Sequence, residues 1–482
     1  MSQKTNILLI TTDEQRFDAI GCFNKYKVNT PHLDSLAANG AYHPHTYTVN
    51  CVCMPARCSL LTGLYSHQHG IMNNRGDLNP SLKTMPQALQ KQGYTTALVG
   101  KEHFFEGFCD LKEMAETTKT TFGFDHFWSV AGKSMIEGSQ DEWTHHLKEK
   151  GLYDTHMQDL TSRMDKRRQG ICEASPTHLN EDDYVDHLVK EKSIDFLNEQ
   201  ASPFFLWTSF CNPHFPFDPP KKYLDKYRLE DMPLPFQCPP DKISYFQEYY
   251  RAYFAMIEQV DTYVGEIIAT LKRNGQFENT LIVFTSDHGD MMGDFGLFAK
   301  TQAFDGATRV PFLAHHPQLI KAGVYKQATE ISDVCATFIE LAGSANLQEE
   351  LPNSPSQSLL KLWQGGDFQR QYAFSELGGQ FKAPFYLLAD QDYKFIYYPE
   401  DQSELLFDLK NDPHEGENII LRETQIADKM RKALLQRIAV TSPPHPSEWI
   451  YQQHYKTASL NPNRCHHGGV PERINRGLQN II

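Results

Sequence analysis

The sequence has no long apolar run. Its 482 residues contain no stretch near the ~20 consecutive apolar residues that a membrane-spanning helix needs. The first apolar segment, Ile7 to Ile10, is much shorter than the hydrophobic region of a signal peptide and leads directly into Asp13. These absences predict a protein with no membrane partner, located in the cytoplasm by default, whose first apolar segment is a buried strand.

Cysteine and clustered positive charge are also scarce. Ten cysteines in a chain of this length do not make a disulfide scaffold, so most are expected to be reduced thiols. The net charge is −14 and there is no long block of Lys and Arg, which argues against nucleic acid as a partner. The chain is longer than one hydrophobic core usually serves, so we expect a large domain and a smaller one.

Short apolar runs rich in β-branched residues alternate with helix-like stretches. The runs are Asn6–Thr12, Thr95–Gly100, Phe204–Phe210, Leu281–Ser286 and Val310–His315. The alternation predicts an α/β fold in which a mostly parallel central sheet is sandwiched by helices. In such folds chemistry gathers beyond the carboxyl ends of the strands. The polar residues that directly follow four of the runs are Asp13, Lys101 with His103, His214, and Asp287 with His288.

Three other regions have distinct patterns of apolar and polar residues. Residues 244–274 show a helical stripe of apolar and aromatic residues, which predicts core packing. Residues 139–180 are polar and indicate either an insertion over the site or a surface excursion. After about residue 356, short runs separated by turn residues predict an antiparallel sheet in a smaller α+β domain. We therefore expect domains at 1–360 and 361–482, with an irregular tail over the final forty residues.

The segment from Cys51 to Gly63 carries the sharpest local signal. Pro55 suits the first turn of a helix and Gly63 suits its C-terminal cap. Cys53 would then lie at a helix N-terminus, with Arg57 one turn on and on the same face. Amide donors, the helix dipole and a guanidinium group would converge there on an anion. Taken alone, Cys53 fits a buried structural thiol better, and its spacing from Cys51 lacks the CxxC pattern of redox or zinc sites.

The surrounding motifs resemble those of a known family. Cys53-x-Pro55-x-Arg57, followed by Leu60-Leu61-Thr62-Gly63, resembles the signature of type I sulfatases, the formylglycine-dependent enzymes of the alkaline-phosphatase-like superfamily. Further segments that resemble this family, in order, are Thr30–Ala37, Gly93–Thr96, Gly100–His103, Ser286–Asp290, Lys300, Arg309–Pro311 and Glu404–Asn418. Glu102 departs from the pattern, because the family usually has Trp at that position. The resemblance implies an alkaline-phosphatase-like fold with its catalytic domain in residues 1–360.

The resemblance also implies one divalent metal and a modified nucleophile made by oxidising Cys53 to formylglycine. The implied metal ligands are Asp13, Glu14, Cys53 in its modified form, Asp287 and His288. Glu14 stands where many members have Asp, and His288 where many have Asn. Such an oxygen-rich set favours Ca²⁺ or Mg²⁺, and the family implies Ca²⁺. Mn²⁺ is a further candidate, because imidazole also suits softer divalent ions.

Roles for the remaining residues follow from the family mechanism. A hydrated aldehyde offers one hydroxyl to attack sulfur and a second to expel the sulfate by re-forming the carbonyl. Asp287 would accept the attacking proton or orient the hydroxyl, and His103 would act as base in the release step. Arg57 and Lys101 would hold the formylglycine and the sulfate, while His214 and Lys300 would meet the leaving oxygen. The predicted catalytic residues are therefore Cys53, Arg57, Lys101, His103, His214, Asp287 and Lys300.

The implied function is a sulfatase, a sulfuric ester hydrolase acting on a carbohydrate or another small organic sulfate. Its implied protein partner is a formylglycine-generating enzyme or an anaerobic sulfatase-maturating enzyme. A phosphonate monoester or phosphodiester hydrolase is the alternative, because phosphodiesters and sulfate monoesters both carry one negative charge. A non-catalytic carbohydrate-binding protein is disfavoured, since binding does not require an oxidisable cysteine. The sequence specifies neither the substrate nor the oligomeric state.

Two further segments are weaker candidates. Asn73, Asn74 and Arg75 follow the nucleophile segment and could line the pocket, although turn-rich surface residues more often do not. The run from Asn463 to Gly469 is rich in His and is interpreted as a solvated tail.

Overall fold

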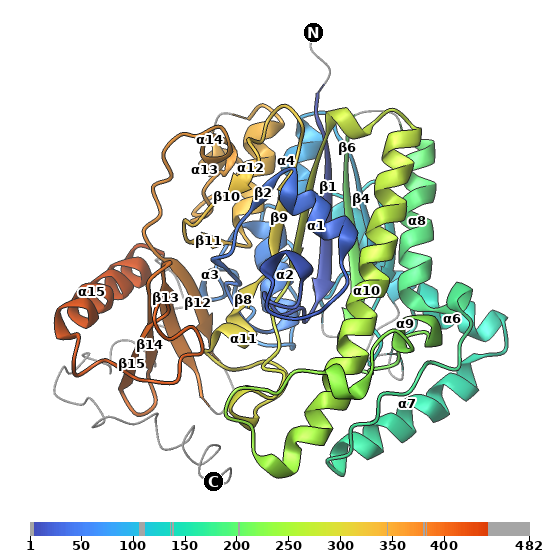
Figure 1. Ribbon diagram of the computed structural model, residues 1–482. Helices are drawn as coiled ribbons and strands as arrows, with labels where there is room; N and C mark the ends of the chain where they lie inside the picture. Colours follow the sequence, from blue (N-terminus) through green and yellow to red (C-terminus); the bar gives the residue numbers. More distant parts are fainter. Residues whose placement is uncertain are drawn as a thin grey trace.

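The computed structural model describes residues 4–105, 111–134, 136, 139–200, 203–344, 346–378, 381 and 383–441. The predicted irregular tail, including Asn463 to Gly469, lies outside these ranges. Within them, an eight-stranded sheet and a four-stranded sheet lie side by side, with a small three-stranded sheet between them (Figure 1). The prediction of an α/β fold with an additional antiparallel sheet is confirmed.

The large sheet has the strand order β10-β2-β9-β7-β1-β6-β4-β5. Its strands are β1 (Asn6–Asp13), β2 (Ala41–Tyr42), β4 (Thr95–Lys101), β5 (His126–Val130), β6 (Phe204–Pro213), β7 (Thr280–Ser286), β9 (Phe312–His315) and β10 (Gly323–Val324). The central strands from β7 to β5 are parallel, as predicted. The predicted run Val310–His315 is divided by Pro311, which lacks a backbone N–H, into β8 (Arg309–Val310) and β9. β9 runs antiparallel to β7, so the sheet is mixed at this side.

Alternating residues of β1 explain why helices cover both faces of this sheet. Ile7 and Leu9 pack into a core with residues of α2 (Cys53–Thr62), α4 (Met85–Lys91) and α12 (Asp333–Leu341). Leu8 and Ile10 point the other way, into a core with residues of α1 (Pro31–Ala38), α8 (Val185–Glu199) and α10 (Ile243–Arg273). A strand buried on both faces must be apolar throughout, and this is what its sequence shows. The stripe predicted over 244–274 is confirmed as core packing.

The four-stranded sheet is antiparallel and consists of β12 (Ala373–Leu377), β13 (Phe385–Ala389), β14 (Tyr393–Tyr398) and β15 (Ser403–Asp408). α15 (Thr424–Thr441), which the sequence analysis did not predict, covers one face through Met430 and Leu434. The opposite face, including Leu387, packs against Phe304 from the first part of the chain. The division of the chain at residue 360 stays a prediction.

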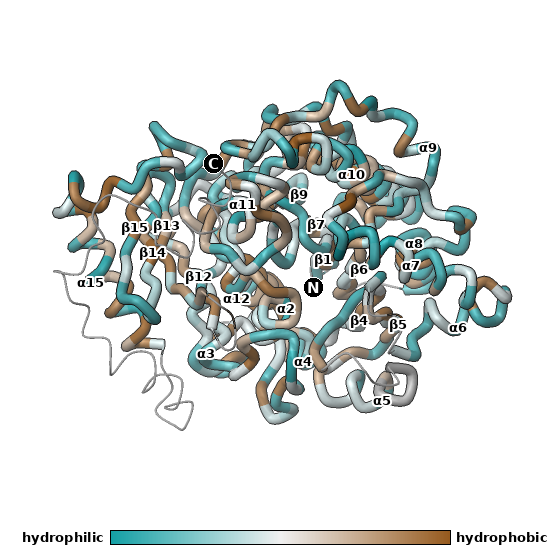
Figure 2. Tube along the Cα trace, turned by 90° about the horizontal axis from the view of Figure 1, so that it is seen from below, coloured by the Kyte–Doolittle hydropathy of each residue, from teal (hydrophilic) through white to brown (hydrophobic). Residues whose placement is uncertain are grey.

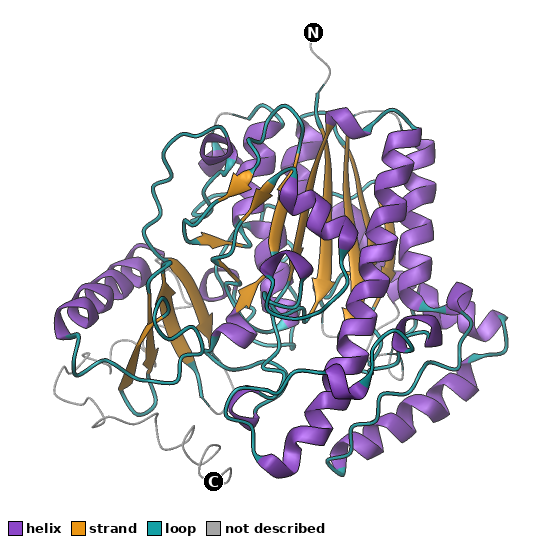
Figure 3. Ribbon diagram, viewed as in Figure 1, coloured by secondary structure: helices purple, strands orange, loops and turns teal. Residues whose placement is uncertain are grey.

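The polar region 139–180 forms two helices, α6 (Glu142–Glu149) and α7 (Tyr153–Arg168). Figure 3 shows α7 beyond the carboxyl ends of the parallel strands. Figure 2 views the molecule from this side, with the ends of β1, β6 and β7 near the centre of the view. The excursion therefore lies on the side where the predicted site residues gather.

The remaining strands and α-helices surround the sheets. They are β3 (Thr46–Tyr47), β11 (Thr329–Glu330), α3 (Ser66–His69), α5 (Leu111–Phe122), α9 (Lys221–Leu224), α11 (Asp305–Thr308), α13 (Leu347–Glu350) and α14 (Leu360–Trp363). Among the described residues, no helix combines the length and the apolar character that crossing a membrane requires.

Candidate active site

Helix α2 holds Cys53 at its first position. The helix ends at Gly63, whose φ of 69° forms a left-handed cap and whose N–H donates to the Ser59 carbonyl at 2.8 Å. At the other end, the free N–H of Met54 donates to Asn74 Oδ1 at 3.0 Å. Asn74 thus supports the start of the helix, and the pocket lining considered for it stays a prediction. Cys53 is 2% exposed, so the predicted nucleophile is buried.

Arg57 connects this helix to the sheet. Its Nε donates to Asp287 Oδ2 at 2.8 Å, and its Nη1 donates to the Lys101 carbonyl at 2.8 Å and to Ser209 Oγ at 2.7 Å. Lys101, Ser209 and Asp287 belong to or follow β4, β6 and β7, so one buried guanidinium group binds three strand ends. Within the described residues Nη2 has no partner and is the donor left for a ligand.

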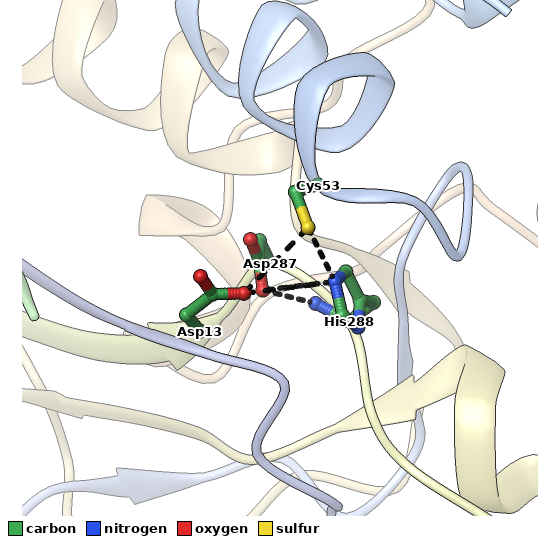
Figure 4. A group of neighbouring side chains, drawn as sticks. All are labelled: Asp13, Cys53, Asp287 and His288. Carbon is green, nitrogen blue, oxygen red and sulfur yellow. Dashed lines mark hydrogen bonds and ion pairs between the residues drawn. The ribbon is translucent and has the colours of Figure 1, made fainter. Parts of the chain in front are cut away.

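Four predicted metal ligands converge on one point (Figure 4). The ligand atoms of Asp13, Cys53, Asp287 and His288 all lie within 4.8 Å of one another, and all four residues are buried. Cys53 Sγ is 3.2 Å from His288 Nε2 and 3.7 Å from Asp13 Oδ1. His288 Nε2 is 3.7 Å from an oxygen of each of the two aspartates.

Glu14 lies in an adjoining group with Asp13 and His214. His214 Nε2 is 3.1 Å from Glu14 Oε2, while Glu14 Oε1 is buried and has no hydrogen-bond partner in the described part of the chain. An unpartnered buried carboxylate oxygen is costly unless a ligand satisfies it. The donor set and this free oxygen fit one divalent cation.

Two lysines face the acids and the thiol. Lys101 pairs with Asp13. Lys300 Nζ lies 2.8 Å from Cys53 Sγ, 3.1 Å from His288 Nε2 and 3.6 Å from Glu14 Oε2. Burial alone would raise the pKa of the Cys53 thiol, but Lys300 and Lys101 hold it well below its ordinary value. The thiolate form is therefore favoured at this position.

The carboxyl groups respond to the same balance of burial and charge. Burial would raise the pKa of Asp13, yet Lys101 and His214 keep it well below its usual range. Burial raises the pKa of Glu14 to about 7 against the opposing effect of Lys300. Burial and then the neighbouring Asp13 raise the pKa of Asp287. The crowding of acids in a buried place is what a bound divalent cation relieves.

The predicted histidines lie at the same site. His103 is buried beyond β4, with a φ of 61°, and burial lowers its pKa. His214 follows β6, and burial lowers its pKa to about 3. The structure thus brings together all of the predicted catalytic and metal-binding residues, and their individual roles stay predictions. Glu102, the departure from the family pattern, is buried and accepts a hydrogen bond from the Phe104 N–H at 2.9 Å.

Sequence reasoning missed residues that support the site from behind. Asp290 Oδ1 accepts from the N–H groups of Met292 at 2.7 Å and Ala299 at 3.0 Å, and Tyr249 donates its hydroxyl to the other oxygen. Tyr253 donates to the Glu14 carbonyl at 2.6 Å. Both tyrosines belong to the stripe interpreted as core packing. Their hydroxyl groups were the only available signal, since a buried Tyr usually needs a polar partner.

Comparison with known proteins agrees with this geometry. The Sulfatase family model matches residues 5–344, and the model of the N-sulphoglucosamine sulphohydrolase C-terminal region matches residues 293–440. An arylsulfatase of Clostridium perfringens is 28% identical, with 90% of this chain and 94% of the relative covered. An N-acetylglucosamine-6-O-sulfatase of Bacteroides thetaiotaomicron is 26% identical, with 91% and 86% covered.

Solved structures share the fold. One, of a protein in complex with its substrate D-glucosamine-2-N,6-O-disulfate, has a TM-score of 0.73 at 20% identity and covers 92% of this chain and 100% of that chain. A phosphonate monoester hydrolase of Agrobacterium radiobacter has a TM-score of 0.73 at 23% identity, with 91% and 96% covered. The Sulfatase family model spans well over half of the chain. The chain belongs to the sulfatase family, the sulfuric ester hydrolases of the alkaline-phosphatase-like fold.

Proposed function

We propose that this enzyme hydrolyses carbohydrate sulfate esters through a formylglycine made from Cys53 and with one divalent metal, Ca²⁺ before Mg²⁺ or Mn²⁺. The observation that carries the proposal is the position of Cys53. Its sulfur lies at the buried start of α2, 2.8 Å from Lys300 and within the group of potential metal ligands. A structural thiol gains nothing from a buried ammonium group and a cluster of carboxylates beside it.

The cation would be held by Asp13, Glu14, Asp287, His288 and the oxygen that replaces the Cys53 sulfur. When bound, it supplies positive charge that polarises the sulfate oxygens. The formylglycine supplies a hydrated aldehyde, with one hydroxyl to attack sulfur and one to expel sulfate by re-forming the carbonyl. Maturation requires a formylglycine-generating or anaerobic sulfatase-maturating enzyme as a partner.

The chain's own residues then divide between the two sides of the sulfate. Asp287, with one oxygen held by Arg57 Nε at 2.8 Å, orients the attacking hydroxyl and accepts its proton. Arg57 keeps Nη2 free for an anionic oxygen. Lys101 holds the sulfate beside Asp13, and His103 takes a proton in the release step.

His214 and Lys300 serve the leaving oxygen. Both contact Glu14 Oε2, at 3.1 Å and 3.6 Å, so they flank the same edge of the site. Lys300 is the stronger candidate for stabilising the developing negative charge, because burial lowers the pKa of His214 to about 3 and leaves its imidazole neutral.

A carbohydrate substrate is supported by relatives named for sugar sulfates, among them the N-acetylglucosamine-6-O-sulfatase. Arylsulfatase and choline-sulfatase relatives define the other substrates to be tried. We also propose a cytoplasmic location, in which imported sulfated molecules would be desulfated. Its support is that the eight cysteines that the structure describes are all free thiols, as expected in a reducing compartment.

The test compares an aryl sulfate, glucosamine 6-sulfate and a matched aryl phosphodiester as substrates of the matured enzyme. We expect kcat/KM to be higher for the sulfates, and Cys53→Ala to abolish turnover while Cys22→Ala, a half-buried cysteine away from the site, retains it. A higher kcat/KM for the phosphodiester would instead favour a phosphonate monoester or phosphodiester hydrolase, an activity carried on the same scaffold by a structural neighbour.

A further inference from the structure

Helix α7 brings an arginine to the edge of the active site. The Arg167 guanidinium carbon lies 4.5 Å from the ring centroid of Phe215 and 5.4 Å from that of Phe298. Phe215 directly follows His214, and Phe298 precedes Lys300 by two residues. Arg167 therefore bridges the two segments that carry the side chains assigned to the leaving group.

The acids near the end of α7 are already paired with other cations. Asp165 pairs with Arg168 at 2.9 Å, Glu173 with Lys166 at 2.7 Å, and Asp159 with Arg163 at 2.7 Å. Across the described ranges, no carboxylate lies within ion-pair distance of the Arg167 guanidinium. Its positive charge therefore has no directly paired acid within the described part of the chain.

The surroundings of Arg167 hold it in place and leave it accessible. The side chain is half-buried, and Phe298 is 48% exposed, which is unusual for a large apolar residue. A cavity of about 60 Å³ opens beside Arg167, and its lining includes Phe215, Phe217 and Tyr245 together with Asp159 and Glu173, whose carboxylates pair with other cations.

We propose that Arg167 is a specificity residue that binds a second anionic group of the substrate, a sulfate or a carboxylate on the leaving-group side. This inference rests on the proposed sulfatase function. A guanidinium group stacked on aromatic rings is preoriented, and its planar donors match sulfate and carboxylate oxygens in pairs. The excursion 139–180 would then select doubly charged sugars over singly charged ones.

Competition against aryl sulfate turnover tests this without requiring that each sugar be cleaved. The inhibitors are N-acetylglucosamine 6-sulfate, glucosamine 2-N,6-O-disulfate, and a matched pair of 2-sulfated hexose and 2-sulfated hexuronic acid. A second anion bound by charge-assisted hydrogen bonds should lower Ki by about 10- to 100-fold. The disulfate reports a second sulfate, and the uronic acid reports a carboxylate.

Substitution assigns that preference to Arg167. In Arg167→Gln the Ki values of the singly and doubly charged sugars should converge, and Arg167→Lys should recover part of the difference. Arg168→Gln is the control, because Arg168 is also at the end of α7 but pairs with Asp165 in solvent. A wild-type enzyme that shows no preference for either second anion, or a preference that survives in Arg167→Gln, would overturn the inference. Absence of turnover of both the aryl sulfate and glucosamine 6-sulfate by the matured wild-type enzyme would instead refute the proposed function itself.

Discussion

The loop that carries Lys300 depends on Asp290, and removing this carboxylate should disable the enzyme. Asp290 Oδ1 accepts from Met292 at 2.7 Å and from Ala299 at 3.0 Å, which closes the loop just before Lys300. Hydrogen bonds to a charged group contribute about 1.5–3 kcal/mol each, so the pair contributes about 3–6 kcal/mol. The prediction therefore compares the activities of the variants Asp290→Ala and Asp290→Asn.

The loop needs this support because its backbone is strained. Four of its non-glycine residues have positive φ: Met292 at 50°, Phe295 at 57°, Ala299 at 58° and Thr301 at 72°. Such positions cost of order 1 kcal/mol or more each, about 4 kcal/mol together, which is comparable to what the two hydrogen bonds supply. In Asp290→Ala the strain exceeds the support, so the loop relaxes and the Lys300 ammonium group moves away from residue 53.

Removal of one positioned charge from a site of this kind lowers kcat by about 100-fold or more. We expect this loss in kcat for an aryl sulfate with Asp290→Ala, whereas Asp290→Asn, which keeps an acceptor oxygen, should retain much more activity. Circular dichroism and the melting temperature report whether the variant is folded. A folded Asp290→Ala enzyme with wild-type kcat would refute the reasoning.

Three other predictions concern charge and stability. Burial raises the pKa of Asp261 to about 7, so its contribution to stability is present below pH 4 and is lost as the pH rises towards 7. In melting experiments, the free energy of unfolding of Asp261→Asn should gain about 4 kcal/mol on that of the wild type between pH 4 and pH 8, and a pH-independent difference would contradict this. Lys394 is buried between Asp305 at 2.6 Å and Glu415 at 2.7 Å, so Lys394→Met should destabilise the protein by about 3–5 kcal/mol in urea unfolding. Chelation should abolish turnover and lower the melting temperature. Ca²⁺ at 100 times its Kd should then raise the free energy of unfolding of the metal-free enzyme by about 2.7 kcal/mol. Glu14→Gln should need a higher Ca²⁺ concentration for the same recovery.

Most of the framework could be predicted from local patterns. Runs such as Asn6–Thr12 are apolar at consecutive positions because β1 is buried on both faces, and this texture predicts a central parallel strand. The start of α2 at Cys53 and its end before Gly63 follow from cap chemistry, so they were also predictable.

The missing parts depend on contacts between residues distant in sequence. α15 has a local signal that the sequence analysis did not use, because Ala427, Met430, Leu434 and Ile438 recur at helical spacing, but the sheet face that they cover depends on distant contacts. Asp290 supports the loop through backbone groups up to nine residues away, and a short DHGD sequence does not show which oxygen meets which N–H. The position of Arg167 depends on how α7 crosses the carboxyl side of the sheet, which composition does not specify.

The central claim is that Cys53 becomes the nucleophile, and peptide mass spectrometry of enzyme from its native host tests it most directly. Trypsin should release one peptide that contains both Cys51 and Cys53 and ends at Arg57, so Cys51 serves as an internal control. The account predicts loss of sulfur and gain of an aldehyde at Cys53 alone, with aryl sulfate turnover proportional to the converted fraction across preparations. Full turnover from enzyme whose Cys53 is entirely thiol would contradict it.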